Sequence, residues 1–263
     1  MTSDADQHFL RASFDGSPEF YERARPVAPQ QVFDDLVTLA RLEPGARLVE
    51  IGCGTGQATL PLAERGFEIV GIELGERLGE LARRKLAPFP RVEVVTSAFE
   101  QWNPRGKQFD AVVAFNSFHW VDPELRFSKS AAILCEGGAL AVVGMRFLVH
   151  DDADPVWMQL QDDHESVAGL SEPRVHVDAV KDRSAEFEES GYFRNVRLRR
   201  YQWDITFDAD AYVSLLRTSS WHQTLDDDVR HRLFERIDDR IRSRPGQTIA
   251  PTMGAVLYVA ERA

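Results

Sequence analysis

The chain has 263 residues, a formal net charge of −11 and a hydrophobic content of 43%. This composition is typical of a folded globular protein and excludes a disordered or collagen-like chain. No apolar run approaches the roughly 18 residues that a membrane span needs, and residues 1–9 lack the features of a secretory signal. The acidic balance disfavours nucleic acid and anionic membranes as main partners.

The cysteine content is low, with only Cys53 and Cys135. Two cysteines are too few for a disulfide framework or a zinc cluster, so we expect no metal site. Free thiols and the absence of a recognisable leader favour a cytoplasmic location.

Strand and helix signals alternate through the first half of the chain. The pattern predicts helices at residues 30–41, 55–65, 76–86 and 123–134, and strands at 47–51, 67–72, 92–96, 109–115 and 139–145. Strands that alternate with helices in this way indicate a parallel sheet with helices on both faces. The unbroken apolar run at 109–115 is typical of a strand buried on both faces.

The second half is less regular. The acid-rich segment 151–183 predicts helical or irregular cover, followed by a helix at 185–190, a sixth strand at 195–203, helices at 208–217 and 226–242, and a last strand at 254–260. Apolar residues recur every four positions from Leu225 to Ile241, which predicts one helix face that packs on the core. We expect a single domain over residues 1–263, with a binding core at 18–145 and cover segments at 146–190 and 204–248.

A glycine-rich loop follows the first predicted strand, from Glu50 to Gly56. Its glycines stand at alternate positions, 52, 54 and 56, and let the backbone approach a ligand closely. The helix behind the loop offers free N–H groups to a polar ligand. Glu50 closes the strand and carries a charge that can face a ligand amine.

A second acid, Glu73, ends the second predicted strand, 73 − 56 = 17 residues after Gly56. An acid at this place accepts hydrogen bonds from the hydroxyls of a ribose. The glycine spacing is G-x-G-x-G, whereas a dinucleotide site would show G-x-G-x-x-G. A nicotinamide-dependent oxidoreductase is therefore the weaker interpretation.

The glycine loop, Glu73 and the placement of the fourth strand together resemble the class I S-adenosylmethionine (SAM)-dependent methyltransferases of small-molecule type. The resemblance covers residues 18–145. The segments 21–26 and 117–123 are similar to a branch that includes ubiquinone-biosynthesis-like and trans-aconitate-methyltransferase-like enzymes. It implies a doubly wound, seven-stranded, mostly parallel sheet, a Rossmann-like methyltransferase fold with helical cover segments, and SAM as cofactor.

The resemblance also implies which residues contact the cofactor. The methionine part is lined by loop residues and by two residues after the fourth strand: Gly52, Cys53, Gly54, Gly56, Asn116 and Ser117. The ribose and adenine are contacted by Glu73, Leu74, Ala98 and Phe99. Tyr21 and Arg25 close the site from the N-terminal side, with Arg25 reaching the cofactor carboxylate. Many relatives carry an aspartate near position 97, where this chain has Ser97, and Glu100 is the alternative contact for the adenine amino group.

His119 is the candidate catalytic residue, because it follows the fourth strand where an acceptor would meet the methyl group. An imidazole with a pKa of about 6.5 suits general-base chemistry near neutrality. If the acceptor is a carboxylate no base is needed, and His119 then shapes the pocket or orients Trp120. Aromatic residues that could line an acceptor pocket are Trp120, Trp157, Trp221 and His222.

The expected activity is methyl transfer to a small-molecule acceptor. A catalytically silent SAM-binding protein and a nucleic-acid methyltransferase are the alternatives. The second would show a basic stripe or an N-P-P-[YF] loop after the fourth strand, where this chain has Asn116-Ser117-Phe118-His119. The sequence leaves the acceptor and the choice between monomer and homodimer open.

Overall fold

The computed structural model describes residues 22, 24–169 and 175–263. Its main sheet has seven strands: β1 (Arg47–Ile51), β2 (Glu68–Glu73), β3 (Val92–Thr96), β4 (Phe109–Phe115), β5 (Leu134–Leu148), β6 (Phe193–Asp204) and β9 (Thr252–Arg262). They lie in the order β3-β2-β1-β4-β5-β9-β6. The first five are parallel, and β9 is antiparallel to both of its neighbours. The expected doubly wound, mostly parallel seven-stranded fold is confirmed.

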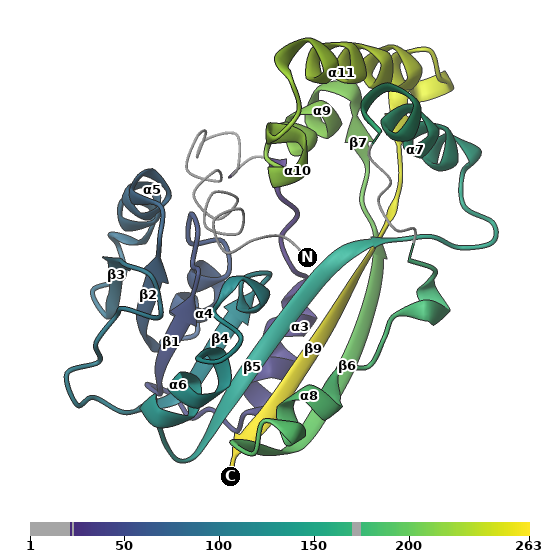
Figure 1. The fold of residues 1–263 in the computed structure, drawn as a ribbon. Coiled ribbons are helices and arrows are strands. Elements are labelled where there is room, and N and C mark those ends of the chain that lie inside the picture. Colours follow the sequence, from purple (N-terminus) through teal and green to yellow (C-terminus); the bar gives the residue numbers. More distant parts are fainter. Residues whose placement is uncertain (1–21, 23, 170–174) are drawn as a thin grey trace.

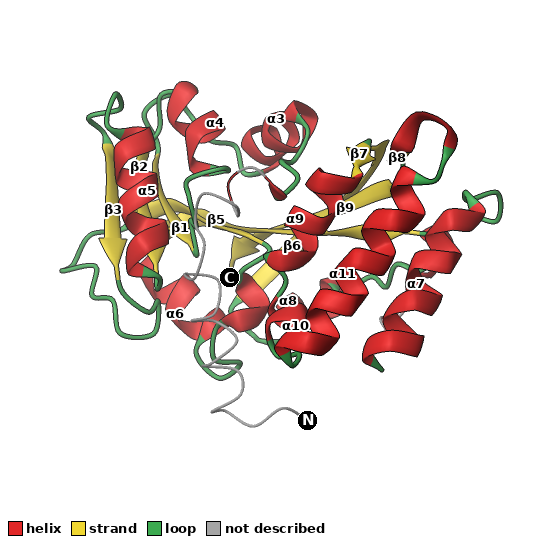
Figure 2. Ribbon diagram, turned by 90° about the horizontal axis from the view of Figure 1, so that it is seen from above, coloured by secondary structure: helices red, strands yellow, loops and turns green. Residues whose placement is uncertain are grey.

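Helices cover both faces of this sheet: α3 (Gln30–Leu39), α4 (Thr59–Glu64), α5 (Glu76–Leu86), α6 (Arg126–Ile133) and α8 (Ser184–Glu189). Figure 2 shows α3 and α4 on one face and α6 and α8 on the other. Neighbouring residues of β1 enter different clusters, because Leu48 packs with the α3 face and Val49 with the α6 face. Burial on both faces explains why the central strands are continuous apolar runs.

A cap stands above the sheet, where the long strands β5, β6 and β9 reach beyond the core (Figure 1). It contains α7 (Pro155–Ala168), α9 (Ala209–Arg217), α10 (Ser220–Gln223), α11 (Asp227–Arg242) and the pair β7 (Phe207–Asp208) and β8 (Thr248–Ile249). The apolar face of α11 is buried as expected, with Leu233, Ile237 and Ile241 enclosed. It packs in a separate cluster with α7 and α9, so it builds the cap and not the sheet core.

The structure differs from the sequence prediction at several boundaries. The predicted helix at 55–65 begins only at Thr59, because Gly54 and Gly56 adopt positive φ and cannot continue an α-helix. The helix predicted from residue 123 begins at Arg126, after a turn in which the N–H groups of Leu125 and Arg126 donate to the carbonyl of Asp122. The short elements β7, β8 and α10 were not expected.

Three short 3₁₀ turns complete the described part: η2 (Phe118–Trp120), η3 (Val177–Ala179) and η4 (Pro245–Gln247). Within these described ranges, no helix has both the length and the apolar character needed to cross a membrane.

Candidate active site

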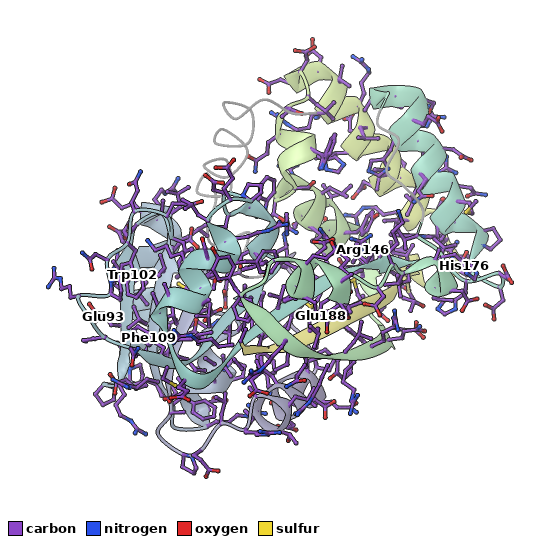
Figure 3. All side chains as sticks on the ribbon, turned by 60° about the horizontal axis from the view of Figure 1, so that its bottom comes forward. Glu93, Trp102, Phe109, Arg146, His176 and Glu188 are labelled. Carbon is purple, nitrogen blue, oxygen red and sulfur yellow. The ribbon has the colours of Figure 1, made fainter. Side chains whose placement is uncertain are left out.

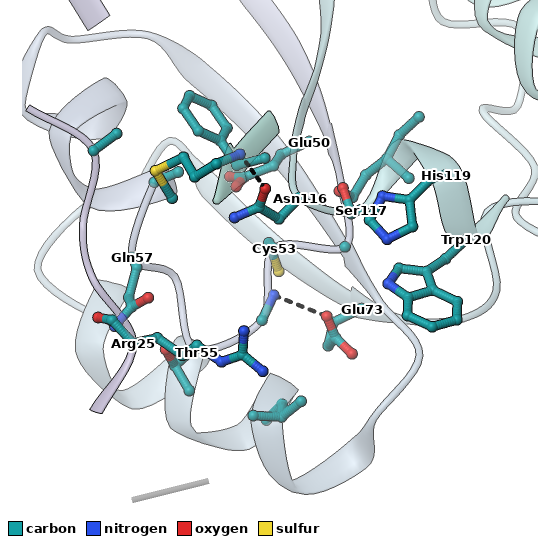
Figure 4. A pocket seen from close by; sticks show the side chains of 18 of the residues that line it. Arg25, Glu50, Cys53, Thr55, Gln57, Glu73, Asn116, Ser117, His119 and Trp120 are labelled. Atoms are coloured by element: carbon teal, nitrogen blue, oxygen red, sulfur yellow. Dashed lines mark hydrogen bonds between the residues drawn. The ribbon is translucent and has the colours of Figure 1, made fainter. Parts of the chain in front are cut away.

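The candidate site is a cavity of about 470 Å³ between the carboxyl ends of the central strands and the cap. The strand order reverses between β1 and β4, and open parallel sheets bind ligands at such a switch point. The loop after β1 forms one wall of the cavity and the loop after β4 forms another. Figure 4 shows the side chains that line it.

The glycine loop is held against both neighbouring strands. The N–H groups of Gly52 and Cys53 donate to the carbonyl of Ile72, at 2.8 and 3.1 Å. Gly52 has a φ of +66°, and a Cβ at this position would lie 2.6 Å from the Cβ of Ser117. The two loops therefore approach as closely as they do only because residue 52 has no side chain.

Gly56 has a different environment. Its φ is +79°, and a Cβ there would lie 2.9 Å from Cδ1 of Leu86 in α5. It does not line the cavity, whereas Gly52, Cys53 and Gly54 do. The structure thus places the third glycine at the contact between the loop and α5.

Glu73 is oriented by two backbone donors. Its Oε2 accepts from the N–H of Gly54 and its Oε1 from the N–H of Gly75, both at 2.8 Å. The side chain is 8% exposed and lines the cavity. These two bonds fix the orientation of the carboxylate at the cavity wall, and Figure 4 shows the bond to the loop.

Glu50 is a buried acid on the floor of the same cavity. It is 1% exposed, and the hydroxyl of Thr59 donates to its Oε2 at 2.6 Å. Burial raises the pKa of Glu50 to about 7, and the nearby carboxylate of Glu73 adds to the rise. A cationic group in the cavity would favour the ionised form of Glu50, since an opposite charge stabilises a carboxylate.

Cys53 packs as a small apolar filler. A Cβ at Gly71 would lie 2.9 Å from its Sγ, so the thiol occupies the space above that glycine. Burial raises the pKa of the Cys53 thiol well above its ordinary value. The thiol is therefore kept protonated, which is the opposite of what a nucleophile requires.

The loop after β4 carries Asn116 and Ser117. Asn116 has a φ of +53°, its N–H donates to the carbonyl of Val143, and its Oδ1 accepts from the N–H of Met145 at 2.6 Å. The hydroxyl of Ser117 donates to the carbonyl of Ile51. These bonds fix the loop between β1 and β5 and turn the chain into η2.

His119 and Trp120 stand at the end of this loop and line the cavity. Their rings lie 5.0 Å apart and are tilted by 41°. Partial desolvation by the surrounding residues, together with the charges of Arg183, Arg146 and Arg126, lowers the pKa of His119 to about 4. The imidazole is neutral at pH 7, and its low pKa makes it a weak proton acceptor.

The roof of the cavity comes from the N-terminal segment and the cap. Arg25 lines it, and its guanidinium donates to Oγ1 and to the carbonyl oxygen of Thr218, at 3.0 and 2.8 Å. Val27 and Trp221 are 49% and 58% exposed and also line it. Arg25, which precedes α3, is thus tied to the end of α9.

Most residues selected from the sequence line this one cavity: Arg25, Glu50, Gly52, Cys53, Gly54, Glu73, Leu74, Phe99, Asn116, Ser117 and His119. Ala98 does not line it, and Tyr21 lies outside the described residues. Ser97 lines it, whereas Glu100 accepts a hydrogen bond from the N–H of Asp122. Of the aromatic candidates, Trp120 and Trp221 line the cavity. Trp157 lines a second cavity, and His222 packs against His164.

Several lining residues were not predicted. Gln57 lies in the loop, where its amide donates to the carbonyl of Glu22 at 2.9 Å. Arg146 and Phe147 come from the end of β5, and Leu215 from the cap. The predicted fifth strand stops at residue 145, whereas β5 continues to Leu148 and so includes Arg146 and Phe147.

The chain is similar to known methyltransferases. Residues 48–138 match the model of a methyltransferase domain family. An uncharacterized methyltransferase of Mycobacterium tuberculosis is 25% identical over 236 residues, which is 90% of this chain and 88% of that protein. A trans-aconitate 2-methyltransferase of Variovorax paradoxus is 31% identical over 136 residues, 49% of each chain.

Solved structures show the same fold. A candidate type II methyltransferase from Anaeromyxobacter dehalogenans superposes with a TM-score of 0.64 at 22% identity, covering 90% of this chain and 97% of that one. The cyclopropane synthase MmaA2 of Mycobacterium tuberculosis superposes with a TM-score of 0.55 at 16% identity, covering 97% and 98%. The chain therefore has the fold of these methyltransferase structures, and the part that matches the methyltransferase domain family is residues 48–138.

Proposed function

We propose that the chain is an enzyme that uses SAM to methylate a small-molecule acceptor. The observation that carries this is Glu73, a buried carboxylate held by two backbone N–H groups at the edge of the cavity. It lies beside a loop whose glycine at 52 leaves no room for a side chain. Together they provide an acceptor pair for ribose hydroxyls and a narrow approach for the methionine part.

The residues present fit this cofactor. Glu73 would bind the ribose, Phe99 and Leu74 would contact the adenine, and the loop at 52–54 would contact the methionine part. Glu50 would face the cationic side of the ligand from below. When bound, SAM would supply a methyl group on a positively charged sulfur, and this sulfur is a good leaving group because it departs as a neutral thioether.

The protein's own contribution is position and enclosure. Orientation of two reactants in one cavity contributes on the order of 7–11 kcal/mol to lowering a barrier. The loop at Asn116–Ser117 fixes the floor, and Trp120 and Trp221 flank the space in which an acceptor would lie. A cavity of about 470 Å³ is in the usual range for small-molecule sites. A reducing compartment such as the cytoplasm would keep the two free cysteines reduced.

The test is turnover. The purified chain should convert SAM to S-adenosylhomocysteine in the presence of a panel of small acceptors, and the product should gain the mass of one CH₂ unit. Binding of SAM without turnover of any acceptor would favour the silent SAM-binding alternative. Turnover with oligonucleotides alone would favour the nucleic-acid alternative.

A further inference from the structure

The charged groups that line the cavity are unevenly distributed. Its two carboxylates, Glu50 and Glu73, stand at the ends of β1 and β2. Arg146 lines the opposite side, on β5, and the strand order places β1 and β4 between it and Glu73. The other arginine of the lining, Arg25, lies in the roof and donates to Thr218. The strand ends assigned to the cofactor are therefore acidic, and the wall left for an acceptor carries the cation of Arg146.

Arg146 is available to a ligand. It is exposed, and among the residues that the structure describes its guanidinium has neither a hydrogen bond nor an ion pair. Figure 3 shows it where the cap helices meet the sheet. Gly144 precedes it by two residues and so points to the same face, and a Cβ at Gly144 would meet nothing within 4 Å. Open space thus adjoins the arginine.

The surroundings of His119 add to this positive charge. Arg183 pairs with Glu186 at 2.5 Å, and Arg126 lies 3.7 Å from the same carboxylate. Glu186 is therefore the ion-pair partner of both Arg183 and Arg126, whereas Arg146 has no acidic partner among the described residues. In addition, Nε of Arg126 is buried and has no hydrogen-bond partner in the described part.

Arg146 lines the cavity and has no partner among the described residues, so it can bind an anion. A guanidinium presents a planar set of donors that matches the two oxygens of a carboxylate. An acceptor with an anionic group could form this charge-assisted pair, whereas an uncharged acceptor could not. The aromatic walls at Trp120 and Phe147 would contact the rest of such a molecule.

We infer that the methyl acceptor is a small organic acid, which binds as its anion to Arg146 on the side of the cavity that His119 lines. This rests on the proposed methyl transfer and specifies its substrate class. Arg146 is a specificity-determining residue, and its role is to hold the acceptor and not the cofactor.

The experiment compares matched acceptors on matched variants. Short di- and tricarboxylic acids, aromatic hydroxy acids and a phosphomonoester of similar size are each assayed beside the corresponding amide or uncharged analogue. The variants are Arg146→Gln, Arg146→Lys and, as a control, Arg232→Gln, whose arginine is exposed on α11 away from the cavity. Affinity for S-adenosylhomocysteine is measured calorimetrically for each.

The wild type should turn over at least one acid and discriminate against its uncharged analogue. Arg146→Gln should raise the KM for that acid roughly ten- to a hundredfold, the range for a lost charge-assisted hydrogen bond, with a smaller change in kcat. Arg146→Lys should fall between, Arg232→Gln should match the wild type, and all variants should bind S-adenosylhomocysteine within about twofold. Retained turnover of the phosphomonoester would show that the site selects anionic charge and not the carboxylate alone.

Four outcomes would overturn the inference. Equal turnover of an acid and its amide would remove the charge from recognition, and so would turnover of uncharged acceptors alone. Loss of S-adenosylhomocysteine affinity in Arg146→Gln would assign the arginine to the cofactor. A wild type that binds the cofactor and methylates no acid would also exclude this substrate class. Failure of the wild type to bind S-adenosylhomocysteine at all would instead refute the proposed function.

Discussion

Burial of Glu50 predicts a specific dependence of stability on pH. Its pKa is about 7 in the folded chain against 4.5 in the unfolded one. The folded state therefore binds the extra proton between these values. The stabilisation is fully present below pH 4.5 and is lost as the pH rises through 7.

Glu50→Gln should remove this dependence, because an amide does not ionise and can still accept from Thr59. At pH 8 the variant should be more stable than the wild type by about 3–4 kcal/mol, at roughly 1.4 kcal/mol per pKa unit, and at pH 4 the two should be similar. Denaturant unfolding at both pH values measures this, with the exposed Glu93→Gln as control. Parallel pH profiles for wild type and Glu50→Gln would contradict the account.

His119 should behave as a neutral side chain during turnover. With a pKa lowered to about 4, it is unprotonated throughout the neutral range. At saturating SAM, whose positive charge favours ionised Glu50, the pH profile of kcat/KM for the acceptor should therefore show no inflection near the ordinary imidazole pKa of about 6.5. For a carboxylate acceptor, His119→Ala should cost far less than the roughly hundredfold or more that is typical of a lost base. An inflection near 6.5 that disappears in His119→Ala would restore the general-base role.

At the scale of elements, the contact between the glycine loop and the β4 loop is the tightest point of the site. Gly52→Ala adds a Cβ 2.6 Å from Ser117 and places alanine at positive φ. Overpacking and backbone strain together should lower the free energy of unfolding by roughly 2–4 kcal/mol. Gly137→Ala is the matched control, because Gly137 also has positive φ (+75°) but nothing within 4 Å of a Cβ.

Gly137→Ala should cost only about 1 kcal/mol, the strain part alone. The difference between the two alanine variants, measured by chemical denaturation, isolates the clash. Equal losses would show that the β4 loop moves freely away from Gly52 and that the approach of the two loops is not fixed.

Arg25 joins two elements, since its guanidinium binds Thr218 at the end of α9. Arg25→Ala removes partners of a buried residue, so amide exchange across α9 and α10 should accelerate. If Arg25 also contacts the cofactor carboxylate, the variant should weaken S-adenosylhomocysteine binding more than that of 5′-methylthioadenosine, which lacks this carboxylate. Unchanged exchange would exclude the tether, and equal effects on both ligands would exclude the contact.

The strands and helices of the sheet could be predicted because two local sequence signals define them: apolar runs for the strands, and glycine or proline where the helices end. Buried central strands such as Phe109–Phe115 are apolar throughout, and glycines or prolines end the intervening helices. The start of α4 was misplaced because positive φ at Gly54 and Gly56 is not visible in a hydrophobic pattern. The strand pair β7–β8 has two residues on each side, too few to give any periodic signal.

Residues of the candidate site that stand at predicted strand ends could be selected from the sequence. Residues whose place or pKa depends on tertiary contacts could not. Glu73 and Gly52 could be selected by spacing alone. Arg146 was missed because β5 continues past the core, supported by its antiparallel pairing with β9 up to Leu148. The low pKa of His119 arises from arginines at positions 126, 146 and 183, which only the fold brings together.

At the scale of the whole molecule, the cavity lies between two bodies of packed side chains. The sheet core forms its floor, and the cap, with its own cluster around Leu233 and Ile237, forms its roof. The long strands β5, β6 and β9 connect the two (Figure 1). The carboxylates of Glu50 and Glu73 on one side and Arg146 on the other agree with the proposed cationic cofactor and the proposed anionic acceptor, respectively.

The most direct test of the central claim is a calorimetric titration of S-adenosylhomocysteine into wild type, Glu73→Ala and Glu93→Ala. Glu73 and Glu93 are both strand acids, and Glu93 is exposed and lies outside the cavity. Wild type and Glu93→Ala should bind one ligand per chain with affinities within about twofold, whereas Glu73→Ala should bind roughly ten- to a hundredfold more weakly. No binding by the wild type, or equal affinity for all three chains, would contradict the assignment of this cavity to SAM.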